Sequence, residues 1–267
     1  MDSQLLIICI LTFVIHLIGT LAYAVRIAGV RTRRIAISFA LFNILVLVSR
    51  TSNSFQGPFL AKRIEENILA GVSQGLLGDF RWILMSATIA TVVGALLIPT
   101  FQRLFSRAVL HFQVHRSVPQ LLLHGFFKGG LAQLKDVAAL PAVSNVTGMR
   151  VGRGISPWVI ALNVGAVALW TIGVFASLYA GYLNPELRVT SSTLSSVVNG
   201  TATILMFVFI DPHMSVMTDD VVEGKTSEPQ FRRAIVWLVG SRLAGTLLAQ
   251  IMLVPAAMVI VFVAGIM

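Results

Sequence analysis

Residues 5–25 read LLIICILTFVIHLIGTLAYAV and contain no Asp, Glu, Lys or Arg. A helix of this length is about 30 Å long, which matches the hydrocarbon core of a bilayer. The apolar residues are continuous rather than alternating, and this pattern favours a helix over a strand of a membrane barrel. Because lipid offers no partners to backbone amides, a helix also satisfies the hydrogen bonds of the segment. The stretch therefore predicts a membrane-spanning helix.

Similar apolar stretches recur along the 267 residues, of which 56% are hydrophobic and only 12% charged. That charged share is about half the share of a typical soluble domain. The sequence thus predicts an all-α, polytopic transmembrane helix bundle, with about six spans and additional interfacial helices in a single integral membrane domain, residues 1–267. The predicted spans are approximately 5–25, 35–57, 81–100, 157–182, 193–211 and 234–265.

Three boundaries in this pattern are less sharply defined. Gly57-Pro58 predicts the end of the second span, because proline disfavours a continuing helix. The segment 101–156 is predicted to be interfacial helix and loop, and a third span extended past the membrane is the alternative. The last apolar stretch is longer than 30 residues. Either Pro255 kinks it or part of it lies outside the hydrocarbon core.

Positive charge is distributed unevenly among the predicted loops. With the N-terminus outside, the inner loops contain four Lys and Arg in 26–34, seven in 103–153 and three in 225–233, whereas the outer segments contain five. Inner loops of membrane proteins are rich in these residues, so we predict both termini outside. The net charge of +9 is then explained by topology and by contact with membrane lipid, and nucleic acid is not an expected partner.

Polar residues within the predicted spans are the candidate functional residues, because lipid makes them costly. Thr12, His16, Thr20 and Tyr23 have the spacing of one helical face. His16 is a candidate for proton or cation coupling; the alternative is that it bonds a neighbouring helix and serves packing.

Two arginines also lie inside predicted spans. Arg50 lies about 10 Å inside the predicted end at Gly57 and shares a face with Asn43 and Asn53. It predicts either an anion site facing a cavity or a side chain that snorkels to the surface. Arg242 lies about two turns into the last stretch and predicts a second anion contact, in a paired or water-filled setting.

Asp211 lies at the inner end of the fifth span, where it can pair with a cationic group. Because it is titratable and can switch the charge of a cavity, it is a second candidate for coupling. Pro212 follows it, so an N-cap of a short helix is an equal alternative.

Motifs for enzyme chemistry are sparse. No phosphate-binding loop or dinucleotide fingerprint occurs, so no cofactor is expected. His111 and His115 have the spacing of two zinc ligands, but Phe112 stands where the metalloprotease pattern needs Glu, and no metal site is expected. The sequence therefore assigns no catalytic residue.

Three long segments are distinctive: HLIGTLAYAVRIAGVRTRRIAISFALFNILVLVSRTSN (16–53), SLYAGYLNPELRVTSSTLSSVVNGTATILMFVFIDPHMSVMTDDVVEG (177–224) and SRLAGTLLAQIMLVPAA (241–257). These segments resemble the Amj family of lipid II flippases, the alternates to MurJ in bacterial peptidoglycan synthesis. The resemblance extends over nearly the whole chain and is weakest in the middle segment.

The resemblance implies a six-span protein of the bacterial plasma membrane. Its implied partner is lipid II, the undecaprenyl-pyrophosphate-linked disaccharide pentapeptide, which it moves from the inner to the outer leaflet. The chain would then be a transporter rather than an enzyme. The sequence is compatible with a monomer and with a homo-oligomer.

Under this hypothesis the planar guanidinium groups of the arginines bind phosphate through pairs of hydrogen bonds. Arg50 and Arg242, together with Asn43 and Asn53, would contact the pyrophosphate inside a cavity. The basic residues of the first inner loop would gather the head group at the inner entrance: Arg26, Arg31, Arg33 and Arg34.

Two other functions are weighed against this one. The string Val48–Ser52 resembles the Ser-Arg-Ser motif of undecaprenyl-pyrophosphate phosphatases, and Glu65 and Glu66 lie nearby, although the Glu-rich companion motif of that family is missing. A structural protein that supports an envelope complex would instead use its polar stripes as contacts between helices.

Overall fold

The computed structural model describes residues 2–71, 75–115, 137–141 and 155–267. The first half contains three long helices: α1 (Ser3–Thr32), α2 (Ile35–Leu69) and α3 (Leu76–His115). The second half contains α7 (Pro157–Leu183), the 3-10 turn η1 (Pro185–Leu187), α8 (Arg188–Thr193), α9 (Ser195–Leu205), the π-helical turn η2 (Met206–Ile210), α10 (Asp211–Val222) and α11 (Glu228–Ile266). No strand occurs within the described ranges.

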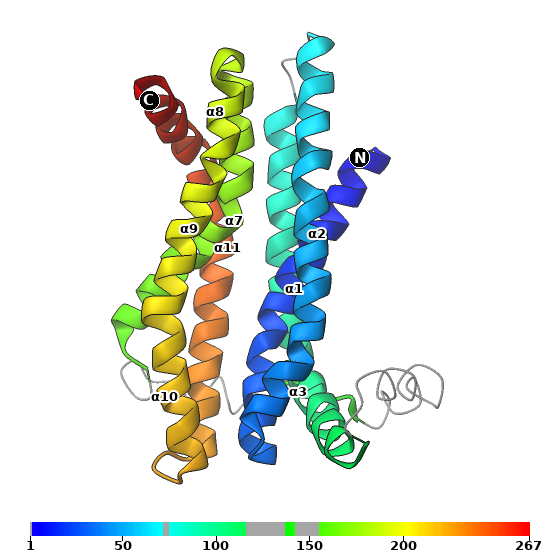
Figure 1. The fold of residues 1–267 in the computed structure, drawn as a ribbon, viewed down its shortest axis with the longest axis vertical. Coiled ribbons are helices and arrows are strands. Elements are labelled where there is room, and N and C mark those ends of the chain that lie inside the picture. Colours follow the sequence, from blue (N-terminus) through cyan, green and yellow to red (C-terminus); the bar gives the residue numbers. More distant parts are fainter. Residues whose placement is uncertain (1, 72–74, 116–136, 142–154) are drawn as a thin grey trace.

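Six helical segments are long and apolar enough to cross a membrane, which confirms the predicted all-α bundle of about six spans. The fifth of them, Pro185–Val222, is assembled from the short pieces η1 to α10. Successive spans run in opposite directions, so both termini lie at the same end of the bundle (Figure 1). The α1–α2 and α10–α11 turns lie at the other end, which we call the basic end after its arginines.

The spans form two groups that stand side by side (Figure 1). Helices α1, α2 and α3 pack on one another as the N-bundle, and α7 to α11 pack around α7 as the C-bundle. Aromatic side chains join the two groups toward the terminal end: Phe80 of α3 meets Phe175 and Tyr179 of α7 edge-on, at centroid distances of 6.3 and 5.3 Å. A single apolar cluster therefore crosses from one bundle to the other.

One predicted helix end is wrong. The helix α2 passes through Gly57-Pro58 and ends only at Leu69. A proline inside a helix costs an amide donor, but the continuation buries Leu60 and Ile64 completely or nearly so in the cluster around Phe80. Tertiary packing thus outweighs the local signal. Where this helix leaves the membrane is still a prediction.

The structure gives the course of the helices at the two other boundaries that the sequence leaves open. Residues 101–115 continue α3, so the third helix extends beyond the predicted span instead of starting a separate interfacial helix. The rest of the predicted segment up to residue 156 lies outside the described residues apart from 137–141 and 155–156. The last stretch is one helix with Pro255 inside it, and its final turns lean away from the bundle (Figure 1).

Candidate functional site

The polar stripe of α1 faces the interior of the bundle, as its spacing predicts. Thr12 and Thr20 are completely buried, and only 3% of His16 is exposed. The Thr12 hydroxyl donates to the Ile8 carbonyl and the Thr20 hydroxyl to the His16 carbonyl, each over 2.8 Å. These hydroxyls are thereby satisfied within their own helix. In contrast, His16 Nδ1 has no hydrogen-bond partner in the part of the chain that the structure describes.

His16 lines a small cavity between the two bundles, which we call the central cavity. Its volume is about 20 Å³, room for about one water molecule. Polar side chains from four helices line it: His16 of α1, Asn53 and Gln56 of α2, Thr171 of α7 and Asn199 of α9. Uncharged polar groups from both halves of the chain therefore meet between the apolar faces of the bundles.

Arg242 of α11 lies against α1 beside this cavity. A Cβ atom on Gly19 would collide with the Nη2 atom of Arg242, so the guanidinium occupies space that the glycine leaves open. It lies within electrostatic range of His16 and Tyr23. Its Nε atom is buried without a partner, and none of the carboxylates that the structure describes forms an ion pair with it. An unpaired cation among apolar helices is costly, and it is the arrangement that an anion site requires.

A second glycine makes room in the same way. A Cβ atom on Gly173 of α7 would collide with the Asn199 amide, whose Oδ1 atom is buried and has no partner within the described ranges. Small residues let polar groups approach a neighbouring helix closely. Both glycines therefore leave room for a polar side chain of a neighbouring helix near the central cavity.

Ion pairs join the two bundles at the basic end. Arg26 of α1 donates from Nη2 to Asp211 of α10 over 2.9 Å, and its guanidinium lies over the ring of Phe39 at 5.1 Å. Arg31 of α1 donates to Glu228 of α11 over 2.9 Å. The prediction that Asp211 pairs with a cation is confirmed. The alternative N-cap is wrong, because Ile210 occupies the cap position and no side chain caps this helix.

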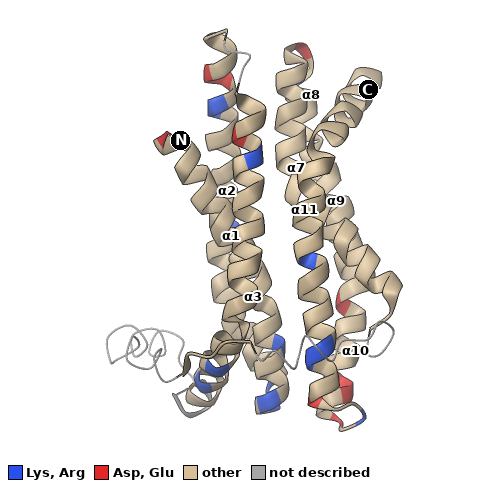
Figure 2. Cartoon of the chain, turned by 180° about the vertical axis from the view of Figure 1, so that it is seen from behind, with Lys and Arg blue, Asp and Glu red and all other residues tan. Residues whose placement is uncertain are grey.

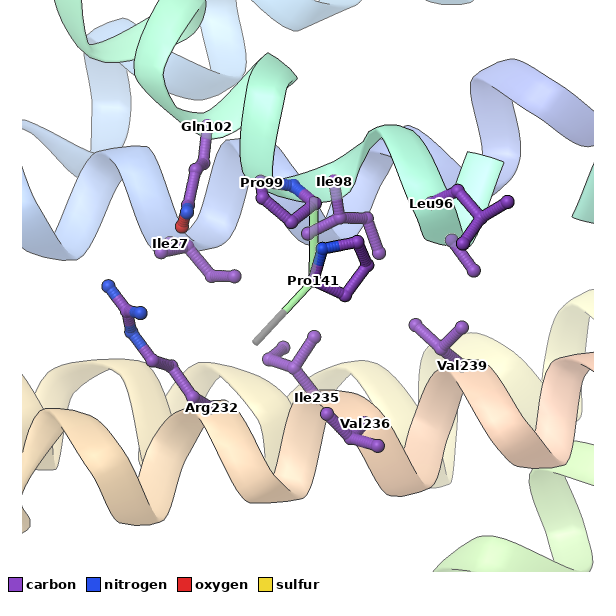
Figure 3. Close-up of a pocket in the computed structure, with 11 residues that line it drawn as sticks. Ile27, Leu96, Ile98, Pro99, Gln102, Pro141, Arg232, Ile235, Val236 and Val239 are labelled. Carbon is purple, nitrogen blue, oxygen red and sulfur yellow. The ribbon is translucent and has the colours of Figure 1, made fainter. Parts of the chain in front are cut away.

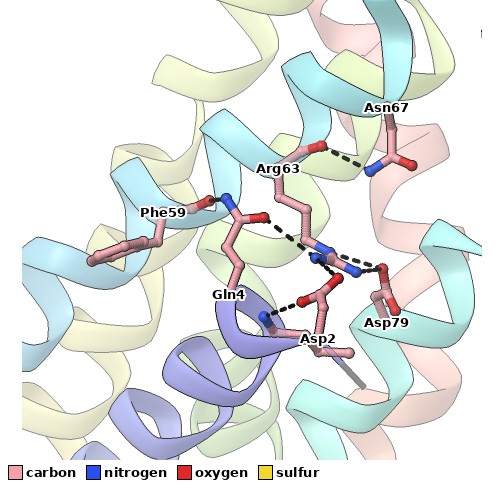
Figure 4. Close-up of polar contacts among 7 residues, drawn as sticks. Asp2, Gln4, Phe59, Arg63, Asn67 and Asp79 are labelled. Atoms are coloured by element: carbon pink, nitrogen blue, oxygen red, sulfur yellow. Dashed lines mark hydrogen bonds and ion pairs between the residues drawn. The ribbon is translucent and has the colours of Figure 1, made fainter. Parts of the chain in front are cut away.

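At the opposite end a single arginine ties the N-bundle together (Figure 4). Arg63 of α2 donates from Nε and Nη2 to Asp79 of α3, over 2.9 and 2.7 Å, and from Nη1 to Asp2 of α1, over 2.7 Å. Asp2 also accepts the Leu5 amide at the start of α1. This amide and the Arg63 guanidinium lower the pKa of the Asp2 carboxyl below its ordinary value of 3.8. We call Asp2, Arg63 and Asp79 the clasp.

The structure brings together only part of the predicted anion site. Asn53 lines the central cavity and Arg242 lies beside it, together with the predicted coupling residue His16. Arg50 and Asn43 are exposed, and no described acidic residue pairs with Arg50. The predicted grouping of Arg50 with Arg242 in one cavity is therefore not observed in this conformation.

The four arginines that the sequence assigns to the first inner loop separate into different settings, and two of them lie within α1. Arg26 and Arg31 hold carboxylates of the C-bundle. Arg33 and Arg34 are exposed and form the tight turn between α1 and α2, with Arg33 at a φ of 54° and the amide of Arg34 bonded to the Gly29 carbonyl. This left-handed residue ends α1 and reverses the chain.

Sequence reasoning missed Gln56, Thr171 and Asn199 as members of the central cavity. Asn199, an amide inside an apolar span, is the same kind of signal that singled out Asn43. Gln56 is a weaker signal, because the sequence predicts the end of the second span beside it. Thr171 carries no such signal, since its hydroxyl bonds its own helix at the Val167 carbonyl.

Comparison with known proteins identifies the family of the chain. The Amj family model (alternate to MurJ) matches residues 11–264. The lipid II flippase Amj of Bacillus subtilis (strain 168) is 40% identical over 259 residues, which cover 96% of this chain and 94% of that protein. No solved structure matches. Because the match includes nearly every residue of all six spans, the chain belongs to the Amj family.

Proposed function

We propose that this protein moves lipid II from the inner to the outer leaflet of a bacterial plasma membrane. The observation that carries the proposal is the Arg242 guanidinium, which lies between the two bundles beside a polar cavity and has no carboxylate partner among the described residues. Membership of the Amj family and the 40% identity to the B. subtilis flippase support the same function.

The proposed path lies between the two bundles. The central cavity holds about 20 Å³, far too little for a pyrophosphate and two sugars, so the N-bundle and C-bundle separate during transport. His16, Asn53, Gln56 and Asn199 then line a hydrophilic route, and Arg242 binds the pyrophosphate through its planar fork. The prenyl tail stays out of this polar route, because transferring it there has no compensating interaction.

The proposed orientation places the basic end in the cytoplasm. Arginines of 31–34, 103–107 and 232–233 gather there, opposite the two termini (Figure 2). The positive-inside rule then supports the prediction that both termini are outside. Substrate made on the cytoplasmic side would therefore arrive first at the basic end.

Coupling is proposed for Asp211 and His16. Asp211 holds Arg26 of the other bundle, so protonation of the carboxylate would remove one ion pair that keeps the basic end closed. His16 faces the central cavity, where a gained proton would add a second cation beside Arg242. Flipping rates measured across an imposed proton gradient test this assignment.

The phosphatase alternative is disfavoured by distance along α2. Arg50 and Glu65 are on the same helix, 15 residues and hence about 22 Å apart. Glu65 and Glu66 also face other cations, Arg188 and Lys62, each at 3.7 Å. The short Ser-Arg-Ser-like string therefore cannot combine with these carboxylates in one catalytic site.

Reconstitution in liposomes tests the proposed function. Purified protein is inserted into vesicles with a fluorescent lipid II analogue, and a membrane-impermeant quencher reports how fast the analogue changes leaflet. The wild type should accelerate exchange over protein-free vesicles. Replacement of Arg242 by Ala removes charge-assisted bonds to pyrophosphate and should slow exchange about ten- to a hundredfold.

Matched variants separate this role from folding. Arg242→Lys keeps the charge without the fork and should retain part of the activity. Arg81→Ala removes an exposed arginine near the start of α3 and should act like the wild type. Arg50→Ala tests the second predicted contact. No acceleration by the wild type would defeat the flippase proposal, and loss of abundance without loss of specific activity in Arg242→Ala would favour a structural role.

A further inference from the structure

A pocket at the basic end is lined by three arginines from two helices. Arg31 and Thr32 of α1 face Arg103, Ser106 and Arg107 of α3 around a volume of about 470 Å³. We call it the arginine pocket. It lies on the surface of the N-bundle, away from the central cavity, and none of its residues lines that cavity.

Two of the three charges in the arginine pocket are not balanced by any carboxylate among the described residues. Arg103 and Arg107 stand one helical turn apart and form no ion pair with any carboxylate that the structure describes. Like charges at this spacing repel each other. The third arginine, Arg31, shares the Glu228 carboxylate with Arg232. Hydroxyl groups of Thr32 and Ser106 add further polar atoms. The chemistry is that of a site for a multiply charged anion.

A second pocket lies between α1, α3 and α11 (Figure 3). Its volume is about 270 Å³, and Ile27, Ile98, Ile235 and Val239 are among the side chains around it. We call it the apolar pocket. A tail of carbon atoms fits this lining, because pockets that hold apolar ligands are lined mainly by apolar side chains.

One end of the apolar pocket is polar. Gln102 and Arg232 project toward the same end, opposite Val239 (Figure 3). Gln102 is only 7% exposed, and its Oε1 atom has no hydrogen-bond partner within the described ranges. A buried amide without a partner costs free energy, so this end is suited to receive a hydrogen-bonding group at the head of a lipid.

The two pockets are adjacent. Ile27 of the apolar pocket precedes Arg31 of the arginine pocket by four residues on α1, and Gln102 precedes Ser106 by four residues on α3. Residues at this spacing are neighbours on a helix, about 6 Å apart along its axis. Both helices run toward the basic end here, so the polar end of the apolar pocket opens next to the arginine pocket.

We propose that the two pockets form one docking site for a prenyl pyrophosphate, with the pyrophosphate in the arginine pocket and the first prenyl units in the apolar pocket. The inference rests on the proposed function, because it identifies where the substrate waits before it crosses. Three guanidinium groups match the several charges of a pyrophosphate better than the single charge of a phosphatidylglycerol head. One apolar pocket accommodates one prenyl chain, whereas a phospholipid has two acyl chains.

Arg31 links this docking site to the closure between the bundles. It holds Glu228 of the C-bundle over 2.9 Å and also lines the arginine pocket. A bound pyrophosphate competes with Glu228 for the same guanidinium. Occupancy of the pocket therefore weakens one of the ion pairs that join the bundles at the basic end, and substrate arrival favours opening.

Equilibrium binding of undecaprenyl pyrophosphate to the purified full chain in nanodiscs tests the head site. Arg103→Gln combined with Arg107→Gln should weaken binding at least about tenfold, since each change removes charge-assisted bonds. The matched control, Lys225→Gln combined with Arg233→Gln, removes the same charge at the same end and should bind like the wild type. Melting temperatures of both double variants show that each is folded.

The tail site has its own test. Val236 lines the apolar pocket, and Val236→Trp fills it; Leu247→Trp places the same ring on an exposed position of the same helix. The first variant should weaken binding of undecaprenyl pyrophosphate about tenfold and leave that of inorganic pyrophosphate unchanged. The second should change neither.

Two outcomes overturn the docking site. Unchanged binding in the Arg103 and Arg107 variant excludes the head site, and equal affinity for phosphatidylglycerol identifies a site for bulk lipid instead. Either outcome leaves the proposed function intact as long as the wild type accelerates flipping in vesicles. A wild type that binds but never flips would defeat the function and leave the site intact.

Discussion

Arg63 and Arg242 are both arginines between packed helices, but their surroundings differ completely. Arg63 meets two carboxylates and ties three helices of the N-bundle together (Figure 4). Arg242 meets the backbone of Gly19 and, among the described residues, no carboxylate at all. An arginine whose donors are all taken by the protein stabilises the fold. An arginine without a carboxylate partner can instead bind an anion that comes from outside the protein.

The clasp should show the largest effect on stability. Arg63→Ala leaves the Asp79 carboxylate, which is 20% exposed, without its partner. We expect a loss of about 2–3 kcal/mol of unfolding free energy, seen as a lower melting temperature in detergent. Lys62→Ala on the same helix breaks only an exposed pair and should change stability by less than about 0.5 kcal/mol. If Arg63→Ala flips lipid slowly at temperatures well below its melting temperature, Arg63 also serves transport, and the contrast with Arg242 is wrong.

Gly19→Ala should reduce flipping and leave stability nearly unchanged, the reverse of the effect expected for Arg63→Ala. The added methyl group displaces the Arg242 guanidinium from the bundle interface, so flipping should fall about tenfold while the melting temperature changes little. Gly165→Ala is the control, since no atom of another residue lies near its Cβ position. That variant should be as active as the wild type and slightly more stable, because alanine is the better helix former. Full activity of Gly19→Ala would show that the position of Arg242 does not matter.

The clasp also predicts a dependence on pH. The Leu5 amide and Arg63 lower the pKa of Asp2, so the folded state holds its proton less tightly than the unfolded state. The stabilisation is complete above about pH 5 and is lost as the pH falls below 3.8 through the lowered pKa. Asp2→Asn should therefore have a lower melting temperature than the wild type at neutral pH, and this difference in melting temperature should disappear in acid. A difference of the same size at all pH values would exclude a charge effect. The effect is smaller than that of Arg63→Ala, because the Asp2 side chain is 57% exposed.

The basic end should show the smallest effect on stability, and of opposite sign. Arg103→Gln combined with Arg107→Gln removes a repulsion between neighbours on α3. The melting temperature should stay constant or rise, by the equivalent of about 0.2–0.5 kcal/mol. Thermal unfolding in detergent without added lipid measures this. A clear destabilisation would mean that these arginines, like Arg63, serve the fold.

Several features of the site could be predicted from single helices. The spacing of Thr12, His16 and Thr20 predicts one face, and burial of that face confirms it. Asp211 was predicted to pair with a cation, and Arg26 is that cation. Both predictions succeed because neighbours on a helix are fixed by its period of 3.6 residues, and because a carboxylate near lipid needs a partner.

Other features depended on contacts between helices that are distant in sequence. Nothing in α2 alone indicates that Pro58 is tolerated, since the packing of Leu60 and Ile64 against Phe80 stabilises the continuation. The pairing of Gly19 with Arg242 joins residues 223 positions apart. No local pattern specifies such a pair.

The sequence by itself determined that this chain is a bundle of about six membrane-spanning helices, because hydropathy and the cost of bare amides in lipid leave no other fold. It also determined the family, through long motifs. Only the tertiary structure decided which arginines are satisfied and which are free to bind: Arg63 closes the clasp, Arg26 and Arg31 join the bundles, and Arg242 has no carboxylate partner among the described residues. The physical reason is that an ion pair depends on the distance between two charges, and in a helical bundle that distance is set by packing rather than by position along the chain.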